Sequence, residues 1–341
     1  MSSIRLAHVA LAALFAATRA PSALAQTDSV PPMPAPGRMV DLGGWRVHLN
    51  CTGTRGAGQP LVVLEAGAGG FSVDFSLVQP EVARFARVCS YDRAGLGWSE
   101  LGPRPRTQRQ IVWELHTLLT SANEAPPYVF VGHSWGGILS RAFTFTYPRE
   151  VVGLVLEESG HERGVQVLRD GKMVRLVETA TGGPVPDPKT SGPLKLSDIP
   201  PQILAQIEQS ARQMQAQAAR NGLPPDAQRM RIWAFGQAKH WATNDNPFEG
   251  EELASLLARW TGSPYPLGDM PVVVLSRGRA GADSVVEQEH TRNQAELLRL
   301  SRKSSQVMAR RSGHEVSLDE PELVVAAIRD VLAAVRKLSP P

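Results

Sequence analysis

The stretch Val129-Phe130-Val131-Gly132-His133-Ser134-Trp135-Gly136-Gly137 is an apolar run that ends abruptly at a serine flanked by glycines. The β-branched and aromatic residues over 128–131 predict a buried strand, and the spacing over 138–147 predicts a helix. Ser134 therefore lies at a strand-to-helix turn, where glycines leave room for the strained backbone that exposes a nucleophile. The free amides that begin the helix favour negative charge beside this serine. A glycine-rich turn with a solvated serine would give the same letters, so other segments must decide.

Apolar runs suited to buried strands alternate with segments of helical spacing on both sides of this turn. The strands are expected over 45–49, 61–64, 88–91, 128–131, 151–156, 271–275 and 307–309, and the helices over 107–120, 138–147 and 321–335. Strands that alternate with helices in this way form a mostly parallel sheet covered by helices. The sequence therefore predicts an α/β fold.

A long segment separates the strand over 151–156 from the strand over 271–275. It spans roughly 110 residues, far more than an ordinary connection of about 2–6 residues. Helical spacing over 203–220, 229–241 and 251–260 predicts a helical cap over residues 163–266. Trp233 and Trp241 are candidates to line a substrate pocket in this cap, with packing inside the cap as the alternative.

The 341 residues, 42% hydrophobic and 20% charged, suit one large globular domain with an insertion. Residues 1–25 have an early arginine, a short apolar run and a final Ala23-Leu24-Ala25, which is typical of a secretory signal peptide. We therefore expect an exported protein, periplasmic or secreted, without a membrane span after cleavage. Residues 26–39 are proline-rich and are expected to form a disordered leader.

The charge of the mature chain offers no case for a nucleic-acid partner. The whole chain has a formal net charge of +3. Cleavage after residue 25 removes two arginines and no acid, which leaves the mature chain near neutral, and no run of lysine or arginine remains to form a basic patch.

Four segments, in order along the chain, resemble those of the α/β-hydrolase fold family, and within it the capped serine esterase-like branch. Residues 61–70 resemble the oxyanion loop, Tyr91-Asp92-Arg93-x-Gly95-x-Gly97-x-Ser99 the segment before the nucleophile, 132–137 the nucleophile elbow, and Ser312-Gly313-His314 with Asp319-x-Pro321 the histidine loop. The resemblance implies a mostly parallel eight-stranded sheet in a core of residues 40–162 and 267–341. It also implies that the cap is inserted between the sixth and seventh strands.

The resemblance also implies a catalytic triad. A serine hydroxyl needs a base to take its proton, and among eight histidines His314 matches the family's position for that base. For the acid that orients the base we favour Glu158, which follows the sixth strand. Asp283, after the seventh strand, is the alternative in the commoner position, but it lies beyond the usual short loop. Glu157 would replace Glu158 after a one-residue shift.

Two backbone amides, those of Trp135 and Ala68, are expected to form the oxyanion hole of such a site. Many relatives have His-Gly where this chain has Ala66-Gly67, which keeps the amide and removes a side chain that shapes the loop. Asp92 and Arg93 are expected to form an internal ion pair that holds the neighbouring loops.

The family's topology predicts a disulfide between Cys51 and Cys89. In that fold the second strand runs antiparallel to the fourth, which brings the end of the strand over 45–49 beside the start of the strand over 88–91. Disulfides persist in proteins that leave the cytoplasm. Two buried free thiols are the alternative.

We expect a serine hydrolase that cleaves an ester, thioester or lactone of a small hydrophobic substrate through an acyl-enzyme, without cofactor or metal. A serine nucleophile argues against the epoxide hydrolase and haloalkane dehalogenase branches, which use aspartate. One alternative is an aminopeptidase of the proline-iminopeptidase type, with Glu249, Glu251 and Glu252 as candidate amine ligands in the cap. Another is a non-catalytic binding protein on the same fold.

Overall fold

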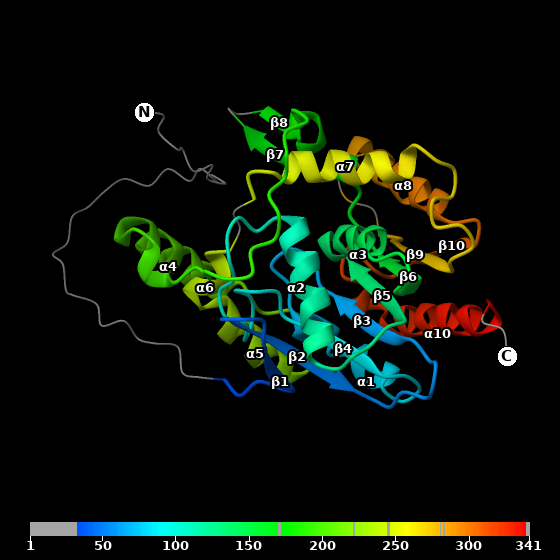
Figure 1. Cartoon of the computed structure of the whole chain (residues 1–341), viewed down its shortest axis with the longest axis horizontal. Coiled ribbons are helices and arrows are strands. Elements are labelled where there is room, and N and C mark those ends of the chain that lie inside the picture. The colour runs from blue at the N-terminus through cyan, green and yellow to red at the C-terminus, as the bar shows by residue number, and fades with distance from the viewer. Residues whose placement is uncertain are drawn as a thin grey trace.

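The computed structural model describes residues 33–169, 172–220, 222–243, 246–279, 281 and 284–338. Its main sheet has eight strands in the order β1-β2-β4-β3-β5-β6-β9-β10 (Figure 1). The strands are β1 (Arg38–Asp41), β2 (Arg46–Thr52), β3 (Leu61–Glu65), β4 (Val88–Tyr91), β5 (Tyr128–His133), β6 (Val151–Glu157), β9 (Val272–Arg277) and β10 (Ser304–Ala309). The first two strands run antiparallel to their neighbours and the others run parallel, so the predicted mostly parallel sheet is confirmed.

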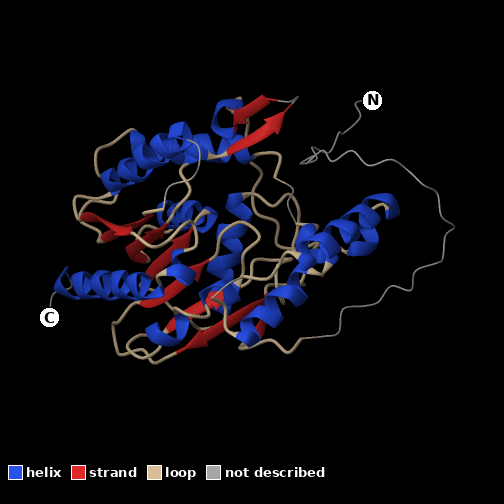
Figure 2. Ribbon diagram, turned by 180° about the vertical axis from the view of Figure 1, so that it is seen from behind, coloured by secondary structure: helices blue, strands red, loops and turns tan. Residues whose placement is uncertain are grey.

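Helices cover both faces of this sheet, as the blue ribbons around the red strands show (Figure 2). They are α1 (Gln79–Val82), α2 (Gln108–Ser121), α3 (Trp135–Thr146), α8 (Ser284–Leu297), α9 (Val316–Asp319) and α10 (Pro321–Leu338), with 3-10 turns η1 (Ser72–Phe75) and η5 (Leu298–Leu300). In β3, Leu61 and Val63 belong to the core cluster beneath α2 and α3, whereas Val62 and Leu64 belong to the cluster beneath α1 and α10. Because both faces are buried, β3 is apolar without alternation.

The helices begin where the sequence supplies a start signal. The Thr107 side chain accepts a hydrogen bond from the backbone N–H of Gln110 at 3.0 Å and so caps α2. Pro321 is the first residue of α10, where a missing N–H costs nothing. The residues of α10 that face the sheet are spaced three or four apart and buried: Val324, Ala327, Ile328, Val331, Leu332 and Val335.

The cap lies between β6 and β9, which are the sixth and seventh strands of the main sheet, as predicted. Its helices are α4 (Pro201–Ala216), α5 (Pro225–Phe235), α6 (Ala238–Trp241) and α7 (Glu249–Thr261), with 3-10 turns η2 (Glu162–Gly164), η3 (Leu176–Thr179) and η4 (Leu196–Asp198). The segment expected as one helix over 229–241 is two helices, because α5 ends at Phe235 and Gly236 follows it as the C-cap. The cap also contains a hairpin, β7 (Gln166–Arg169) and β8 (Lys172–Arg175), which the sequence does not predict.

The end of the proline-rich leader is ordered. The Met33 carbonyl accepts a hydrogen bond from Trp98 Nε1 at 2.8 Å, and Arg38 Nη2 donates to the Ala122 carbonyl at 2.6 Å. Strand β1 begins at Arg38. The prediction of disorder over 26–39 is therefore wrong for residues 33–39, which these contacts fix to the core. Residues 26–32 and the predicted signal peptide, 1–25, lie outside the described residues.

Cys51 and Cys89 face each other across the antiparallel pair β2–β4 and are joined by a disulfide with a Cα–Cα distance of 4.0 Å. The bridge ties the sheet's second strand to its third in spatial order and closes a loop with a sequence separation of 38 residues.

Across the described part of the chain, we find no helix with the length and apolar character to cross a membrane.

Candidate active site

Ser134 is held in a strained turn between β5 and α3. Its φ of 53° and ψ of −120° lie outside the regions that ordinary side chains adopt. A Cβ on Gly132 would lie 2.6 Å from the Gly136 carbonyl oxygen, and a Cβ on Gly136 would lie 2.2 Å from the Glu65 carbonyl oxygen. Neither position tolerates a side chain without a backbone shift, so the two glycines are what permits the turn.

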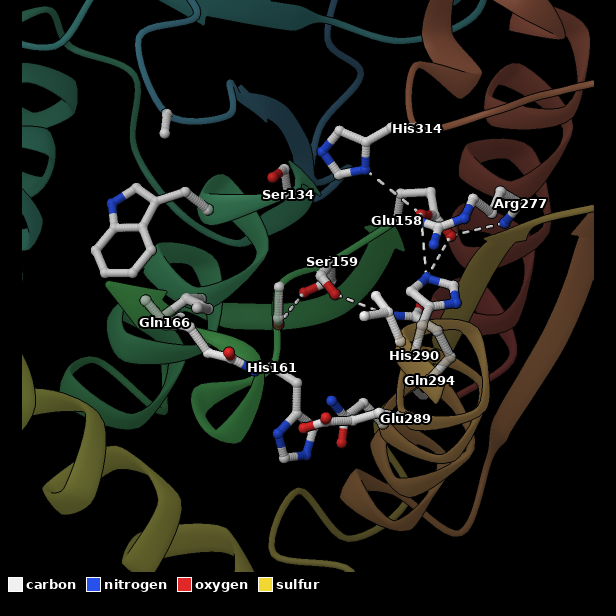
Figure 3. Close-up of a pocket in the computed structure, with 18 residues that line it drawn as sticks. Ser134, Glu158, Ser159, His161, Gln166, Arg277, Glu289, His290, Gln294 and His314 are labelled. Carbon is white, nitrogen blue, oxygen red and sulfur yellow. Dashed lines mark hydrogen bonds and ion pairs between the residues drawn. The ribbon is translucent and has the colours of Figure 1, made fainter. Parts of the chain in front are cut away.

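His314 and Glu158 lie next to this turn. The imidazole of His314, in the loop between β10 and α9, lies between the side chains of Ser134 and Glu158 (Figure 3). His314 Nδ1 is 3.4 Å from Glu158 Oε2. The side chain of His314 is 47% exposed and that of Glu158 is fully buried, so the base reaches the cavity and the acid is shielded from water. The structure thus brings together the serine, histidine and preferred acid of the sequence analysis.

Glu158 is held by more donors than His314 alone. Its Oε1 accepts a hydrogen bond from the Arg277 backbone N–H at 2.7 Å, and its Oε2 accepts one from Arg277 Nη1 at 2.9 Å. His290 Nε2 lies 3.1 Å from each of the two oxygens. Burial alone would raise the pKa of Glu158, but the hydrogen bonds from His290, His314 and the Arg277 backbone outweigh it and hold that pKa well below the ordinary value. Glu158 is therefore a carboxylate at neutral pH.

The loop after Glu158 is anchored to α3 by a fully buried arginine. Glu158 itself has a positive φ of 42°. Arg141 Nη1 donates to the Gly137 carbonyl at 3.1 Å and to Ser159 Oγ at 2.7 Å, and Arg141 Nη2 donates to the Gly160 carbonyl at 2.9 Å. These bonds stabilise the turn that directs Glu158 towards His314.

Glu157, the neighbouring candidate acid, has a different partner in the structure. Glu157 accepts hydrogen bonds from the Ser317 backbone N–H at 2.5 Å and from the Ser317 hydroxyl at 2.6 Å, which places it at the start of α9. Burial raises the pKa of Glu157. Asp283 lies outside the described residues.

The loop after β3 passes close to the serine, as an oxyanion loop must. A Cβ on Gly67 would lie 3.3 Å from Ser134 Cβ, and Ala68 lines the same cavity as Ser134 and Trp135. The carbonyls of this loop are turned away towards Arg93, whose guanidinium donates to the Ala66 carbonyl at 2.7 Å and also to the Gly67 carbonyl. With these two carbonyls bound by Arg93, the loop presents Ala68 at the cavity that contains Ser134.

The predicted ion pair between Asp92 and Arg93 is wrong, although both residues hold loops. Arg93 Nη1 pairs with Glu65 Oε1 at 2.6 Å. Asp92 faces His48, at 3.0 Å between carboxylate oxygen and Nδ1, and accepts hydrogen bonds from the backbone N–H groups of Ser72 and Trp98. Neighbours in a strand-end segment point to opposite sides, so each finds its partner on a different element.

Two cavities meet at the expected oxyanion donors. The first, of about 400 Å³, contains Ser134, Glu158, His290 and His314. The second, of about 330 Å³, is lined by Leu96, Ile111, Asn246 and Glu249 among others, and shares Ala68, Trp135 and Val165 with the first. Ser134, Glu158 and His314 line only the first cavity, so the second cavity lies beyond the expected oxyanion donors and away from the base.

Trp233 and Trp241 line neither of these two cavities, and both take part in packing between aromatic rings, the alternative to a role in the pocket. The ring of Trp233 packs on Trp98 with centroids 5.3 Å apart. Trp241 packs edge-on against Phe235, 5.4 Å away, and its Nε1 donates to the Phe235 carbonyl at 2.8 Å. Both belong to the apolar cluster that joins the cap to the ordered end of the leader.

The sequence analysis missed Arg277 and His290. A signal existed for Arg277, because it directly follows the apolar run of β9, and the carboxyl ends of neighbouring parallel strands meet at one edge of the sheet. His290 is in the middle of α8 and carries no motif.

Where metal binding is concerned, the described residues offer one cluster, Cys51, Cys89 and Glu124, whose two sulfurs are already bonded to each other.

Comparison with known proteins agrees with this geometry. The chain matches the alpha/beta hydrolase family over residues 61–327. It is 28% identical over 298 residues to an AB hydrolase superfamily protein of Gibberella zeae, a match that covers 82% of this chain and 88% of that protein. Its fold is similar to that of a thermophilic esterase from Thermogutta terrifontis (TM-score 0.57, 18% identity, 88% of this chain and 99% of the other). It is also similar to the fold of an enol-lactonase from Burkholderia xenovorans LB400 (TM-score 0.58, 16% identity, 87% and 100%). The chain belongs to the alpha/beta hydrolase family.

Proposed function

We propose that the protein is a serine hydrolase that cleaves an ester, thioester or lactone of a small substrate. The observation that carries this proposal is the juxtaposition of Ser134, in its strained turn, with a His314 that contacts the buried carboxylate of Glu158. A serine in a solvated turn would need neither a strained backbone nor a histidine paired with a carboxylate. Strained residues also concentrate at functional sites.

The reaction proceeds in two displacements. Ser134 Oγ attacks the substrate's carbonyl carbon while His314 Nε2 takes the hydroxyl proton, and Glu158 stabilises the resulting imidazolium. The amides of Trp135 and Ala68 bind the oxyanion, where loss of one donor typically costs about 3–4 kcal/mol of transition-state stabilisation. His314 then gives its proton to the departing alcohol or thiol, which leaves the acyl group on Ser134. Water, activated by His314, releases the acid and restores the serine.

The two cavities support a division of the substrate between them. The leaving group must lie on the side of the histidine that protonates it, which is the cavity of about 400 Å³. The acyl group then occupies the cavity of about 330 Å³, where Leu96 and Ile111 supply apolar contacts. The size of this second cavity favours a short acyl chain.

A panel of p-nitrophenyl esters of increasing acyl length tests the proposal, together with a fluorophosphonate probe that labels activated serines. We expect turnover that is highest for short acyl chains, and labelling at Ser134 that is lost in Ser134→Ala. Folded protein that neither turns over any ester nor reacts with the probe would favour the non-catalytic binding protein instead.

One observation favours the aminopeptidase as a second candidate. Of the three cap glutamates, Glu251 accepts hydrogen bonds from the Thr181 backbone and hydroxyl, and Glu252 accepts them from the Gln108 and Arg109 backbone, so both are engaged. Glu249 lines the second cavity. Burial, and then the nearby charge of Glu252, raises the pKa of Glu249 to about 7. A substrate ammonium group would stabilise its charged form.

A matched pair of variants separates the two candidates. If the protein is an aminopeptidase, Glu249→Gln should lower the turnover of an aminoacyl arylamide at least tenfold and leave the turnover of p-nitrophenyl acetate unchanged. The control Glu251→Gln should change neither rate. If the protein is an esterase, the wild type and both variants should all turn over little arylamide.

We further propose that the protein works outside the cytoplasm. The disulfide between Cys51 and Cys89 supports this, because such bonds persist in oxidising compartments. Fractionation of cells that express the full chain, followed by alkylation of free thiols, provides the test. A cytoplasmic pool that holds most of the activity would contradict the proposal.

A further inference from the structure

We propose that His290 is a positioning residue of this site, whose imidazole holds the carboxylate of Glu158 in the orientation that presents Oε2 to His314. The inference rests on the proposed serine hydrolase function and adds a residue that lies in none of the family-like segments of the sequence. His290 does not contact the reacting atoms; it acts through Glu158.

The distances support this role. His290 Nε2 lies 3.1 Å from both oxygens of Glu158, whereas His314 Nδ1 lies 3.4 Å from one of them. His290 Nε2 is therefore equidistant from the two carboxylate oxygens, so that an N–H on this nitrogen is shared between them. A donor in this position resists rotation of the carboxylate about its last torsion, which is otherwise a soft degree of freedom.

Arg277 completes the restraint from the other side. Its backbone N–H reaches Oε1 at 2.7 Å and its Nη1 reaches Oε2 at 2.9 Å. Figure 3 shows His290 and Arg277 approaching Glu158 from different elements, α8 and the end of β9. Each oxygen thus has one donor from Arg277 and a share of His290, so His314 meets a carboxylate that is already oriented. Preorganised supports of this kind spare the reacting groups the cost of ordering.

The charges around His290 leave Glu158 as its partner. On α8 itself, Glu287 Oε1 is paired with Arg277 Nη2 at 2.6 Å, and Glu289 Oε1 is paired with Arg175 Nη2 of β8 at 2.7 Å. His314 lies across the triad carboxylate. The third acid of the helix, Glu296, is paired with Arg163 Nη1 at 2.5 Å. Because each acid on the helix already has an arginine, His290 Nε2 is available to Glu158.

The test compares three substitutions. His290→Ala removes the donor, His290→Gln replaces it with an amide N–H at a similar reach, and His116→Ala is the matched control. His116 also faces a glutamate, with Nε2 3.2 Å from Glu150 Oε1, but lies on α2 outside both cavities. We expect His290→Ala to lower kcat for a p-nitrophenyl ester at least tenfold with KM within about twofold, and His290→Gln to recover most of kcat. His116→Ala should keep wild-type rates.

The pH profile supplies a readout that a purely structural role would not move. A carboxylate that turns away from His314 stabilises the imidazolium less, so the acidic limb of kcat/KM should move to lower pH in His290→Ala and not in the control. If His290→Ala does not fold, His290→Met, which keeps volume and lacks the donor, takes its place.

Two outcomes are separable. Active wild-type enzyme whose kcat and acidic limb are unchanged in a folded His290 variant would overturn this inference alone. Folded wild-type protein without ester turnover or fluorophosphonate labelling would overturn the proposed function, and the inference with it.

Discussion

Glu158→Gln is the most informative single substitution in this chain, because it keeps the side chain's volume and removes its charge. Both oxygens of Glu158 accept hydrogen bonds, Oε1 from the Arg277 backbone and Oε2 from the Arg277 guanidinium and His314. The NH₂ group of a glutamine would face a donor in either orientation. The substitution therefore both removes the anion that His314 needs and places two donors against each other.

The expected effect on catalysis is large. A neutral amide cannot stabilise the imidazolium, and the loss of a triad acid typically lowers kcat about 10⁴-fold, equivalent to about 5 kcal/mol of barrier. The fold should also lose stability, because removal of one member of a buried ion pair typically costs about 3–5 kcal/mol. Since the Arg277 side chain is 17% exposed and can regain some hydration, we expect the lower end, about 3 kcal/mol.

The loss of stability should depend on pH in a defined direction. Hydrogen bonds hold the pKa of Glu158 in the folded protein below the ordinary value of 4.5. Its contribution to the free energy of unfolding is therefore fully present above that pH and is lost as the pH falls further. The difference in stability between wild type and Glu158→Gln should thus be constant near neutrality and should shrink on acidification.

Steady-state kinetics with a short-chain p-nitrophenyl ester and urea unfolding measure the two effects. Asp283→Asn is the matched control, with an expected change in kcat below tenfold. Folded Glu158→Gln protein with turnover within tenfold of wild type would refute the assignment, and a larger loss in Asp283→Asn would move the acid to the loop after β9.

Three further predictions test the turn, the triad and the bridge. Ser134→Ala and His314→Ala should each reduce ester turnover to background while the circular dichroism spectrum stays unchanged, since the triad works as a unit; a rate near wild type in either variant would exclude the assignment. Gly136→Ala should lower Tm and activity together, because its Cβ would lie 2.2 Å from a backbone carbonyl oxygen of β3; an unchanged Tm would mean that the turn adapts. Reduction of the Cys51–Cys89 bridge should lower the free energy of unfolding by about 4 kcal/mol in the chain-entropy model, measured by urea titration with and without dithiothreitol. A difference below about 1 kcal/mol would show that the reduced chain keeps the loop closed in its unfolded state.

The buried strands were predictable because their pattern needs no knowledge of the rest of the chain. β3 and β4 are fully buried, so β3 is apolar up to Glu65 and β4 is apolar except for Ser90. The hairpin β7–β8 has no such signal, because Lys172–Arg175 is only half-buried or exposed and too short to show a period. Its existence depends on contacts with neighbouring elements.

The candidate catalytic residues were predictable to the extent that each carries a local motif. Ser134 and His314 lie in short glycine-containing segments, and the order of four such family-like segments along the chain is what singles them out. The aromatic residues of the cap could not be assigned in the same way, because a tryptophan on a cap helix fits a pocket wall and a packed cluster equally well. What decides between them here is the leader, whose Met33 and Met39 pack with Trp98, Trp233 and Trp241.

The position of the acid follows from the register of the sheet. Glu157 pairs with Leu275 between β6 and β9, so Glu158 and Arg277 both project from the carboxyl ends of adjacent parallel strands into the same space. An acid on either strand is thus within reach of a histidine loop above this edge. When the acid follows β6, the end of β9 can carry a residue that binds this acid. In this chain that residue is the cation Arg277. The ion pair fixes the carboxylate and also competes with His314 for its charge, so a second donor such as His290, which reaches both oxygens, shares the task of orienting Glu158.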